Sequence, residues 1–267
     1  MRRVALSIIL CFLSALAIPQ SPGSDAALLA KTRSLYDAPF TRNLASFDCA
    51  VRFDWQKHFA EFVRTVPPTA QPTIERLQGV RHRVFVDRSG ATVSAQTKAP
   101  DFEGDRSATL LEPALTAMIT QGLNAWLPFS TNVILPVGPT KYSFQTLGSG
   151  YKLVMNGTNV AATILLDADL KVTSGVVQLP QDLRFTTEFE TGPDGYLLKS
   201  VETGSTAESA VGGNATFAYT YQAVDGIQLP SEVIVSPATA KPFHLALTDC
   251  KVVKFAIVKV GPPPAPR

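Results

Sequence analysis

The stretch TFAYTYQAVDGIQLPSEVIV, residues 216–235, contains two runs in which apolar side chains recur at every second position. Alternation of this kind gives a β-strand one apolar face and one polar face. Asp225-Gly226 separates the runs, and Asp-Gly is a strong hairpin signal because glycine accepts positive φ without steric cost. The in-phase apolar residues are Phe217, Tyr219 and Tyr221 before the turn, and Ile227, Leu229, Val233 and Val235 after it.

Turn signals recur on both sides of this hairpin, every 8 to 18 residues or so from Lys141 to Lys259. Such spacing is typical of a meander of antiparallel strands. Earlier in the chain, residues 44–53 and the hairpin of residues 80–96 also have strand character. We expect ten or eleven strands in all. The turns of the meander lie at residues 148–150, 156–157, 167–169, 180–182, 193–195, 212–213 and 225–226.

Three segments have helical spacing instead. One runs from about Ser24 to Tyr36, and a second from Trp55 to Val66. The strongest carries an apolar stripe, and we expect Pro113 in its first turn and Pro128 at its end. The stripe consists of Leu111, Leu115, Met118, Ile119, Leu123 and Trp126.

A long sheet with one apolar face must cover that face, and the apolar helices are available for this purpose. We therefore predict an α+β fold in which a long curved antiparallel sheet, a half-barrel, wraps around two or three helices. No domain linker is visible, so residues 24–260 form one predicted domain. The Pro-rich tail at 261–267 is expected to be extended and solvated.

Residues 1–17 have the composition of a secretory signal peptide. Arg2 and Arg3 precede the apolar run Val4–Leu16, and Ala-Leu-Ala at 15–17 matches a cleavage pattern. The run is short for a membrane span, although an uncleaved anchor is the alternative. We expect an exported protein, periplasmic or else secreted, without a transmembrane segment after cleavage.

Signal removal also changes the charge. Without Arg2 and Arg3, the 24 Lys and Arg residues fall to 22, equal to the 22 Asp and Glu residues. A neutral chain lacks the basic surface that nucleic acid requires, so we expect no nucleic-acid partner. The mature protein is expected to be a monomer.

Cys49 and Cys250 both lie in apolar runs, one near each end of the mature chain. In an oxidising compartment two cysteines pair more often than they remain free, which predicts a disulfide. Two buried thiols that never meet are the alternative.

The order of these elements resembles the periplasmic lipoprotein-carrier fold, the half-barrel of LolA-like proteins. The phrases GPDGYLLKSVE at 192–202 and YQAVDGIQLPSEVIV at 221–235 are similar to the paired late hairpins of that family. The resemblance is best from Arg184 to Val235. It implies a hollow between sheet and helices that binds a hydrophobic small molecule, a lipid or a lipoprotein.

Signatures of catalysis are missing from the sequence. His58, His82 and His244 form no zinc spacing, and there is no CxxC, nucleophile elbow, phosphate loop or dinucleotide fingerprint. The acidic residues of 101–112 are spaced like a calcium loop, but their glycine is misplaced. We expect no enzyme activity, no cofactor and no metal, and we expect His82 in the core.

The leading hypothesis is a non-enzymatic carrier of a hydrophobic ligand, for which a cavity of several hundred Å³ would be expected. An envelope interaction scaffold with a packed core is the alternative, and a hydrolase built around His82 or His244 is third. The candidate ligand-lining residues are Met118, Trp126, Phe185, Phe189, Tyr219, Tyr221, Ile227 and Leu229.

Overall fold

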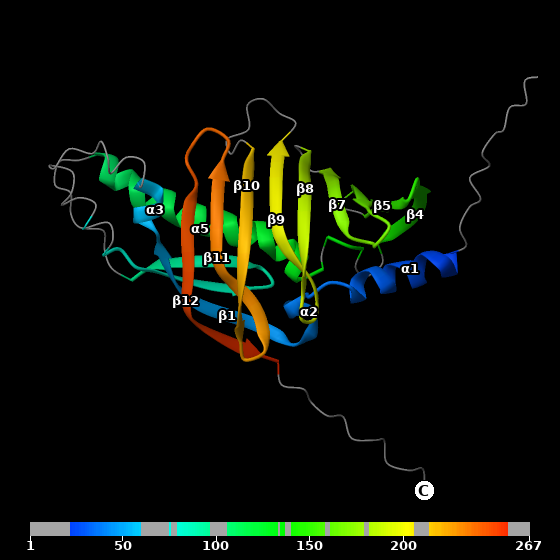
Figure 1. The fold of residues 1–267 in the computed structure, drawn as a ribbon, viewed down its shortest axis with the longest axis horizontal. Coiled ribbons are helices and arrows are strands. Elements are labelled where there is room, and N and C mark those ends of the chain that lie inside the picture. The colour runs from blue at the N-terminus through cyan, green and yellow to red at the C-terminus, as the bar shows by residue number, and fades with distance from the viewer. Residues whose placement is uncertain are drawn as a thin grey trace, which may run out of the picture.

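The fold is taken from a computed structural model (Figure 1). It describes residues 22–59, 75, 79–96, 106–132, 134–136, 140–157, 161–178, 182–205 and 214–255. The predicted signal peptide at 1–17, the acidic residues at 101–105 and the tail at 261–267 lie outside the described residues, so these predictions stay untested.

The helices occupy three of the expected places. Helix α1 spans Pro22–Ser34, α3 spans Trp55–Phe59 and α5 spans Arg106–Ser130. The part of the second predicted helix beyond Phe59 lies outside the described residues. Helix α2, Pro39–Arg42, is a single turn that was not predicted, and it begins at a proline whose missing N–H costs nothing there.

Twelve strands form one antiparallel sheet, more than the ten or eleven expected. The first three precede α5 and the other nine follow it. Their bounds are β1 Leu44–Phe53, β2 His82–Asp87, β3 Gly90–Ala95, β4 Lys141–Leu147, β5 Gly150–Asn156, β6 Ala161–Leu166, β7 Val172–Gln178, β8 Leu183–Gly192, β9 Gly195–Ser205, β10 Ala215–Val224, β11 Ile227–Pro237 and β12 Phe243–Lys254.

The sheet order is β3-β2-β1-β12-β11-β10-β9-β8-β7-β6-β5-β4. The meander from β4 to β12 is therefore continuous, and the last strand returns to pair with the first. The sheet is open, with β3 and β4 at its edges. Figure 1 shows the sheet twisting strongly from one edge to the other, with α5 lying across it.

The hairpin of residues 216–235 forms as the alternation predicts. Strands β10 and β11 pair antiparallel, and both Asp225 and Gly226 have positive φ in the turn between them. A bulge between Thr220 and Tyr221 shifts the register once. All the in-phase apolar side chains are buried except that of Tyr221, which is half-buried.

The predicted ends of α5 are wrong. Pro113 and Pro128 both lie inside the helix, which runs from Arg106 to Ser130. Pro128 has no N–H, so the last turn of the helix lacks one backbone hydrogen bond. Because the helix continues past Pro128, it buries the Phe129 side chain against the sheet, and this burial offsets the lost hydrogen bond. The side chain of Met118, predicted to lie on the buried stripe, is only half-buried.

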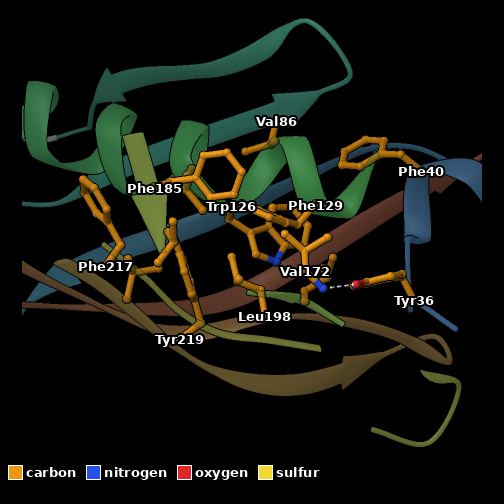
Figure 2. Packing of buried hydrophobic residues seen from close by; sticks show 14 of the residues in the cluster. Tyr36, Phe40, Val86, Trp126, Phe129, Val172, Phe185, Leu198, Phe217 and Tyr219 are labelled. Atoms are coloured by element: carbon orange, nitrogen blue, oxygen red, sulfur yellow. Dashed lines mark hydrogen bonds between the residues drawn. The ribbon is translucent and has the colours of Figure 1, made fainter. Parts of the chain in front are cut away.

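Helix α5 packs closely on the sheet at Gly122. A Cβ atom there would lie 3.0 Å from Cγ1 of Val233 and 3.4 Å from Cγ2 of Val235, both on β11. The Tyr219 hydroxyl donates a hydrogen bond to the Gly122 carbonyl at 2.9 Å. Figure 2 shows Trp126 and Phe129 reaching from α5 into the apolar cluster formed with the strands.

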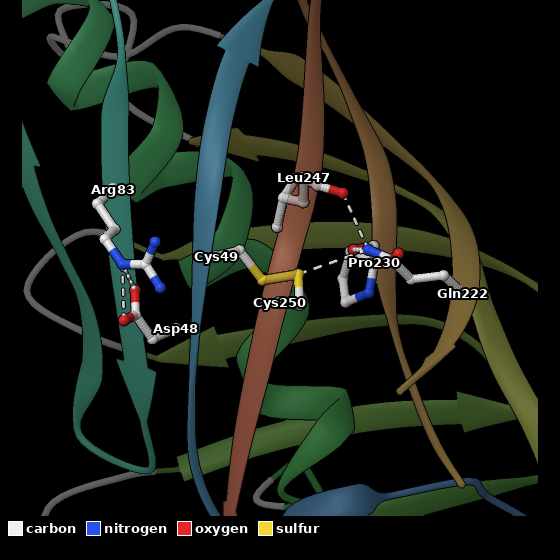
Figure 3. Close-up of a disulfide and its surroundings, with 7 residues drawn as sticks. All are labelled: Asp48, Cys49, Arg83, Gln222, Pro230, Leu247 and Cys250. Carbon is white, nitrogen blue, oxygen red and sulfur yellow. Dashed lines mark hydrogen bonds and ion pairs between the residues drawn. A yellow bond between two sulfur atoms is a disulfide. The ribbon is translucent and has the colours of Figure 1, made fainter. Parts of the chain in front are cut away.

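The predicted disulfide between Cys49 and Cys250 is present, with Cα atoms 4.1 Å apart (Figure 3). It joins β1 to β12 across a register shift, where Asp249 has positive φ. On the β2 side, Arg83 forms an ion pair with Asp48 at 2.7 Å. The bridge links residues 201 positions apart and so ties the two ends of the domain together.

Candidate functional site

A pocket lies where the C-terminal end of α5 meets strands β8 to β11, and we call it the aromatic pocket. Three of its lining residues come from α5, and the linker between α1 and α2 supplies two more. The lining residues are Tyr36, Asp37, Trp126, Phe129, Ser130, Phe189, Tyr196, Leu197, Leu198, Tyr221 and Gln228.

The aromatic pocket is small. Its free volume is about 10 Å³, which is room for one water molecule. A site for a drug-sized ligand has several hundred Å³, so the described residues that line this pocket leave no space for an acyl chain in the present conformation. The carrier hypothesis therefore requires the pocket to open.

Aromatic rings make up most of the wall and support one another edge to face. The ring centroid of Phe129 lies 6.0 Å from that of Phe185 and 5.9 Å from that of Phe189. Tyr36 lies 5.1 Å from Phe189 and 5.8 Å from Tyr196. These contacts join the linker after α1, the end of α5 and strands β8 and β9 in one cluster.

Hydroxyl groups inside this wall are hydrogen-bonded to the backbone and, at Tyr221, to the indole of Trp126. Tyr221 donates to the Leu198 carbonyl at 2.7 Å and accepts the indole N–H of Trp126 at 3.2 Å. Tyr36 accepts the backbone N–H of Val172 at 2.6 Å, as Figure 2 shows. Burial is the main cause that raises the pKa of both tyrosine hydroxyls, so both remain neutral donors at physiological pH.

Asp37 places a carboxylate in the wall of this apolar pocket. Its side chain is 0% exposed and its Oδ1 forms an ion pair with Arg42, which also contacts Asp194 at 3.0 Å. The second oxygen, Oδ2, is buried and has no hydrogen-bond partner. Burial raises the pKa of Asp37, and the neighbouring Arg42 guanidinium opposes that shift.

Three of the eight predicted lining residues do line the pocket, namely Trp126, Phe189 and Tyr221. The other five do not. Phe185, Tyr219, Ile227 and Leu229 are buried in the core, and Met118 lies outside the core cluster.

Two pocket residues, Phe129 and Asp37, were not predicted from the sequence. Phe129 follows Trp126 at helical spacing, and only the expectation that Pro128 ends the helix hid it. Asp37 lies in a linker and reaches the pocket because its backbone N–H bonds to the Tyr196 carbonyl at 3.0 Å. That contact joins residues far apart in sequence, so no local pattern could indicate it.

None of the three histidines lines the aromatic pocket. His82 is fully buried on the inward face of β2, as predicted, with its ring 5.9 Å from that of Phe53. His244 Nδ1 lies 2.9 Å from Glu232 Oε1, the carboxylate neighbour that the hydrolase hypothesis required. Lys57 Nζ binds the same oxygen at 3.0 Å, so we interpret the group as an ion-pair network outside the aromatic pocket.

No protein-family model matches this chain, and no curated protein matches it significantly. The resemblance to lipoprotein carriers thus stays a prediction. Among the described residues, no three metal-binding side chains gather at one point. Within the same residues, no helix has both the length and the hydropathy that crossing a bilayer needs.

Proposed function

We propose that this protein is an exported, non-enzymatic binding protein that holds a hydrophobic ligand, an acyl chain or a lipidated segment, between its sheet and α5. In this proposal the sheet acts as a half-barrel around the helix, as LolA-like carriers imply, and the periplasm is the expected compartment. The disulfide between Cys49 and Cys250 is compatible with such an oxidising environment.

The aromatic pocket carries this proposal. It joins the end of α5 to four neighbouring strands and contains three predicted ligand-lining residues. Its rim reaches the surface at the half-buried side chains of Phe189, Tyr196 and Gln228. Sites for small ligands are mostly apolar with a few placed polar groups, and this pocket has that composition.

Ligand entry requires α5 to move away from the sheet, because the closed pocket holds only about 10 Å³. Two hydrogen bonds to side chains of β10 oppose this movement in the closed form. They run from the Tyr219 hydroxyl to the Gly122 carbonyl and from the Trp126 indole to the Tyr221 hydroxyl. Burial of an acyl chain would offset their loss at about 25 cal/mol per Å² of apolar surface.

The two tryptophans of the chain, Trp55 and Trp126, allow a direct test. A fluorescent polyene fatty acid accepts energy from a nearby indole. In Trp55→Phe, where Trp126 is the only donor, we expect saturable quenching of indole emission by the bound probe. In the matched variant Trp126→Phe, Trp55 lies outside the pocket wall and the quenching should be weaker.

Lipid extraction and native mass spectrometry of protein from its own host complete the test. Co-purified fatty ligand is the expected result. Protein that carries no lipid and binds no acyl probe would exclude the carrier function.

A packed-core interaction scaffold at the cell envelope is the second candidate. The small free volume favours it, as do outward apolar side chains near the end of β12, where Val253 is 58% and Phe255 53% exposed. An affinity pull-down that returns envelope proteins, together with a lipid-free protein, would favour the scaffold over the carrier.

A further inference from the structure

We infer that the end of α5, residues 128–132, is a gate that opens the aromatic pocket by turning about Pro128, ahead of any movement of the rest of the helix. This inference rests on the proposed function, since it names the part of the protein that admits the ligand. It also makes a distinction that the proposed function does not make, between a local opening and the detachment of the whole helix.

The part of α5 that precedes the gate is held on the sheet by several contacts. Gly122 packs closely on Val233, and its carbonyl accepts the hydrogen bond from the Tyr219 hydroxyl. One turn further along the edge of the sheet, the Asn124 side chain accepts the backbone N–H of Ala91 on β3 at 3.0 Å. Movement of this part of the helix breaks all these contacts together, so it is the more costly way to open the pocket.

The backbone of α5 changes at Pro128. In a regular helix each N–H bonds to the carbonyl four residues earlier, but Pro128 has no N–H to give to the Asn124 carbonyl. Three donors converge on the Leu127 carbonyl, namely the Thr131 N–H at 3.0 Å, the Thr131 hydroxyl at 2.8 Å and the Ser130 hydroxyl at 2.9 Å. A carbonyl has two lone pairs, so the hydroxyls keep this one bonded when the N–H bond breaks. Helices bend at prolines and at hydroxyls bonded in this way.

A buried polar atom also favours the open gate. Asn132 Oδ1 is buried and has no hydrogen-bond partner in the described part of the chain. Such an atom costs free energy in the closed form, and water satisfies it once the gate opens. The chain is fixed again just beyond the gate, where Leu135 is 0% exposed. The gate is therefore a short segment between two anchored parts of the chain.

The gate carries one part of the pocket wall. The side chains of Phe129 and Ser130 line the pocket, and the Phe129 ring closes it against Phe185 and Phe189. Leu198 lines the same pocket from β9 and is 2% exposed. When the gate turns, Phe129 leaves the wall and Leu198 becomes accessible. An acyl chain that enters replaces the apolar contacts that Phe129 gives up.

Labelling of Leu198→Cys by N-ethylmaleimide, followed by mass spectrometry of the whole mature protein, tests the inference without a ligand. Leu229→Cys is the matched control, because it is the same substitution at a residue that is 0% exposed on β11 and does not line the pocket. We expect the thiol of Leu198→Cys to react at least about tenfold faster, since a local opening costs less than global unfolding.

Pro128→Ala restores the missing N–H and should slow the labelling of Leu198→Cys by about fivefold, the effect of one net hydrogen bond. Pro113→Ala is its matched control, because Pro113 is an exposed proline of the same helix that does not line the pocket. It should leave the labelling rate within about twofold of Leu198→Cys alone. If Leu198→Cys does not fold, hydrogen exchange of the amides of residues 129–131 in the two proline variants decides by the same ratio.

Equal labelling of the two thiols, or equal rates in the two proline variants, would show that the end of α5 does not open by itself and would overturn the inference. The acyl probe separates this result from the carrier function. A protein that shows the expected labelling but binds no probe keeps the gate and loses the carrier. Probe binding together with equal labelling keeps the carrier and removes the gate.

Discussion

Tyr221 connects α5 to the sheet through a single hydroxyl. It donates to the Leu198 carbonyl on β9 and accepts the indole N–H of Trp126 on α5. The ring also lines the aromatic pocket. Tyr221 therefore both holds α5 to the sheet and lines the proposed ligand site, and loss of its hydroxyl group should affect both roles.

Tyr221→Phe should lower the free energy of unfolding by about 1–3 kcal/mol, because it removes the hydrogen bonds of the hydroxyl to the Leu198 carbonyl and to the Trp126 indole N–H. Urea denaturation measures this. Tyr142→Phe is the control, since the Tyr142 hydroxyl has no hydrogen bond among the described residues and its loss should change little. Equal effects of the two variants would contradict the assigned role of the Tyr221 hydroxyl.

Glu232 should give stability a dependence on acid pH. Its hydrogen bond to His244, with Lys57 beside it, lowers its pKa below the usual 4.5, against the effect of partial burial. The unfolded chain then takes up the proton first, so stability is full above about pH 5 and falls as pH drops through the lowered pKa. Asp54 is the other charged group near Lys57.

Glu232→Gln should therefore flatten the fall of melting temperature between about pH 5 and pH 3. Glu188→Gln is the comparison, because Glu188 is mostly exposed and, within the described part of the chain, forms its ion pair with Lys199 alone. A Glu232→Gln profile as steep as that of wild type would mean that other carboxylates set the acid limit.

At the scale of elements, β7 and β8 fit together through one glycine. Gly175 lies directly opposite Phe185, and a Cβ atom there would come within 2.5 Å of the Phe185 ring and 2.7 Å of Ile164 Cδ1. Phe185 in turn contacts Phe129 of α5. The absence of a side chain at Gly175 thus leaves room for the Phe185 ring, which contacts α5 through Phe129.

Gly175→Ala should destabilise the fold by about 1–3 kcal/mol through overpacking, measured by thermal or urea unfolding. Gly23→Ala introduces the same methyl group in α1, where no atom lies within 4 Å. We expect Gly23→Ala to be neutral or slightly stabilising, since alanine is the better helix former. A stable Gly175→Ala protein would show that Phe185 can move aside.

At the scale of the whole molecule, the last strand closes the fold. Strand β12 lies between β1 and β11, and the disulfide joins it to β1 over a separation of 201 residues. The bridge lowers the conformational entropy of the unfolded chain, and this effect grows with the length of the closed loop. It should therefore stabilise the folded domain by up to about 5 kcal/mol.

Replacing both cysteines by alanine should remove most of that stabilisation and lower the urea midpoint strongly. Reduction of the wild-type protein by dithiothreitol should give the same midpoint, because both treatments open the same loop. A double variant as stable as the oxidised protein would show that the sheet alone holds the two ends together.

The sequence predicted most of the strands and their inward faces. Alternation and turn residues are local signals, so the hairpin at 225–226, strand β1 and the buried His82 could all be read from neighbouring residues. The disulfide could be predicted because Cys49 and Cys250 are the two cysteines after the predicted signal peptide, and two cysteines in an exported protein usually pair. Helix α5 was found, but not its ends, since burial of Phe129 outweighs the local effect of Pro128.

Sequence alone thus determined where the chain is extended, where it turns and which side chains of each strand are apolar. These properties depend on residues within a few positions of one another. Only the tertiary structure decided which apolar residues face α5, that Asp37 reaches the aromatic pocket, and how little free space remains there. Those depend on contacts between distant segments, such as the bond from Asp37 to Tyr196, and on close packing that no local pattern encodes.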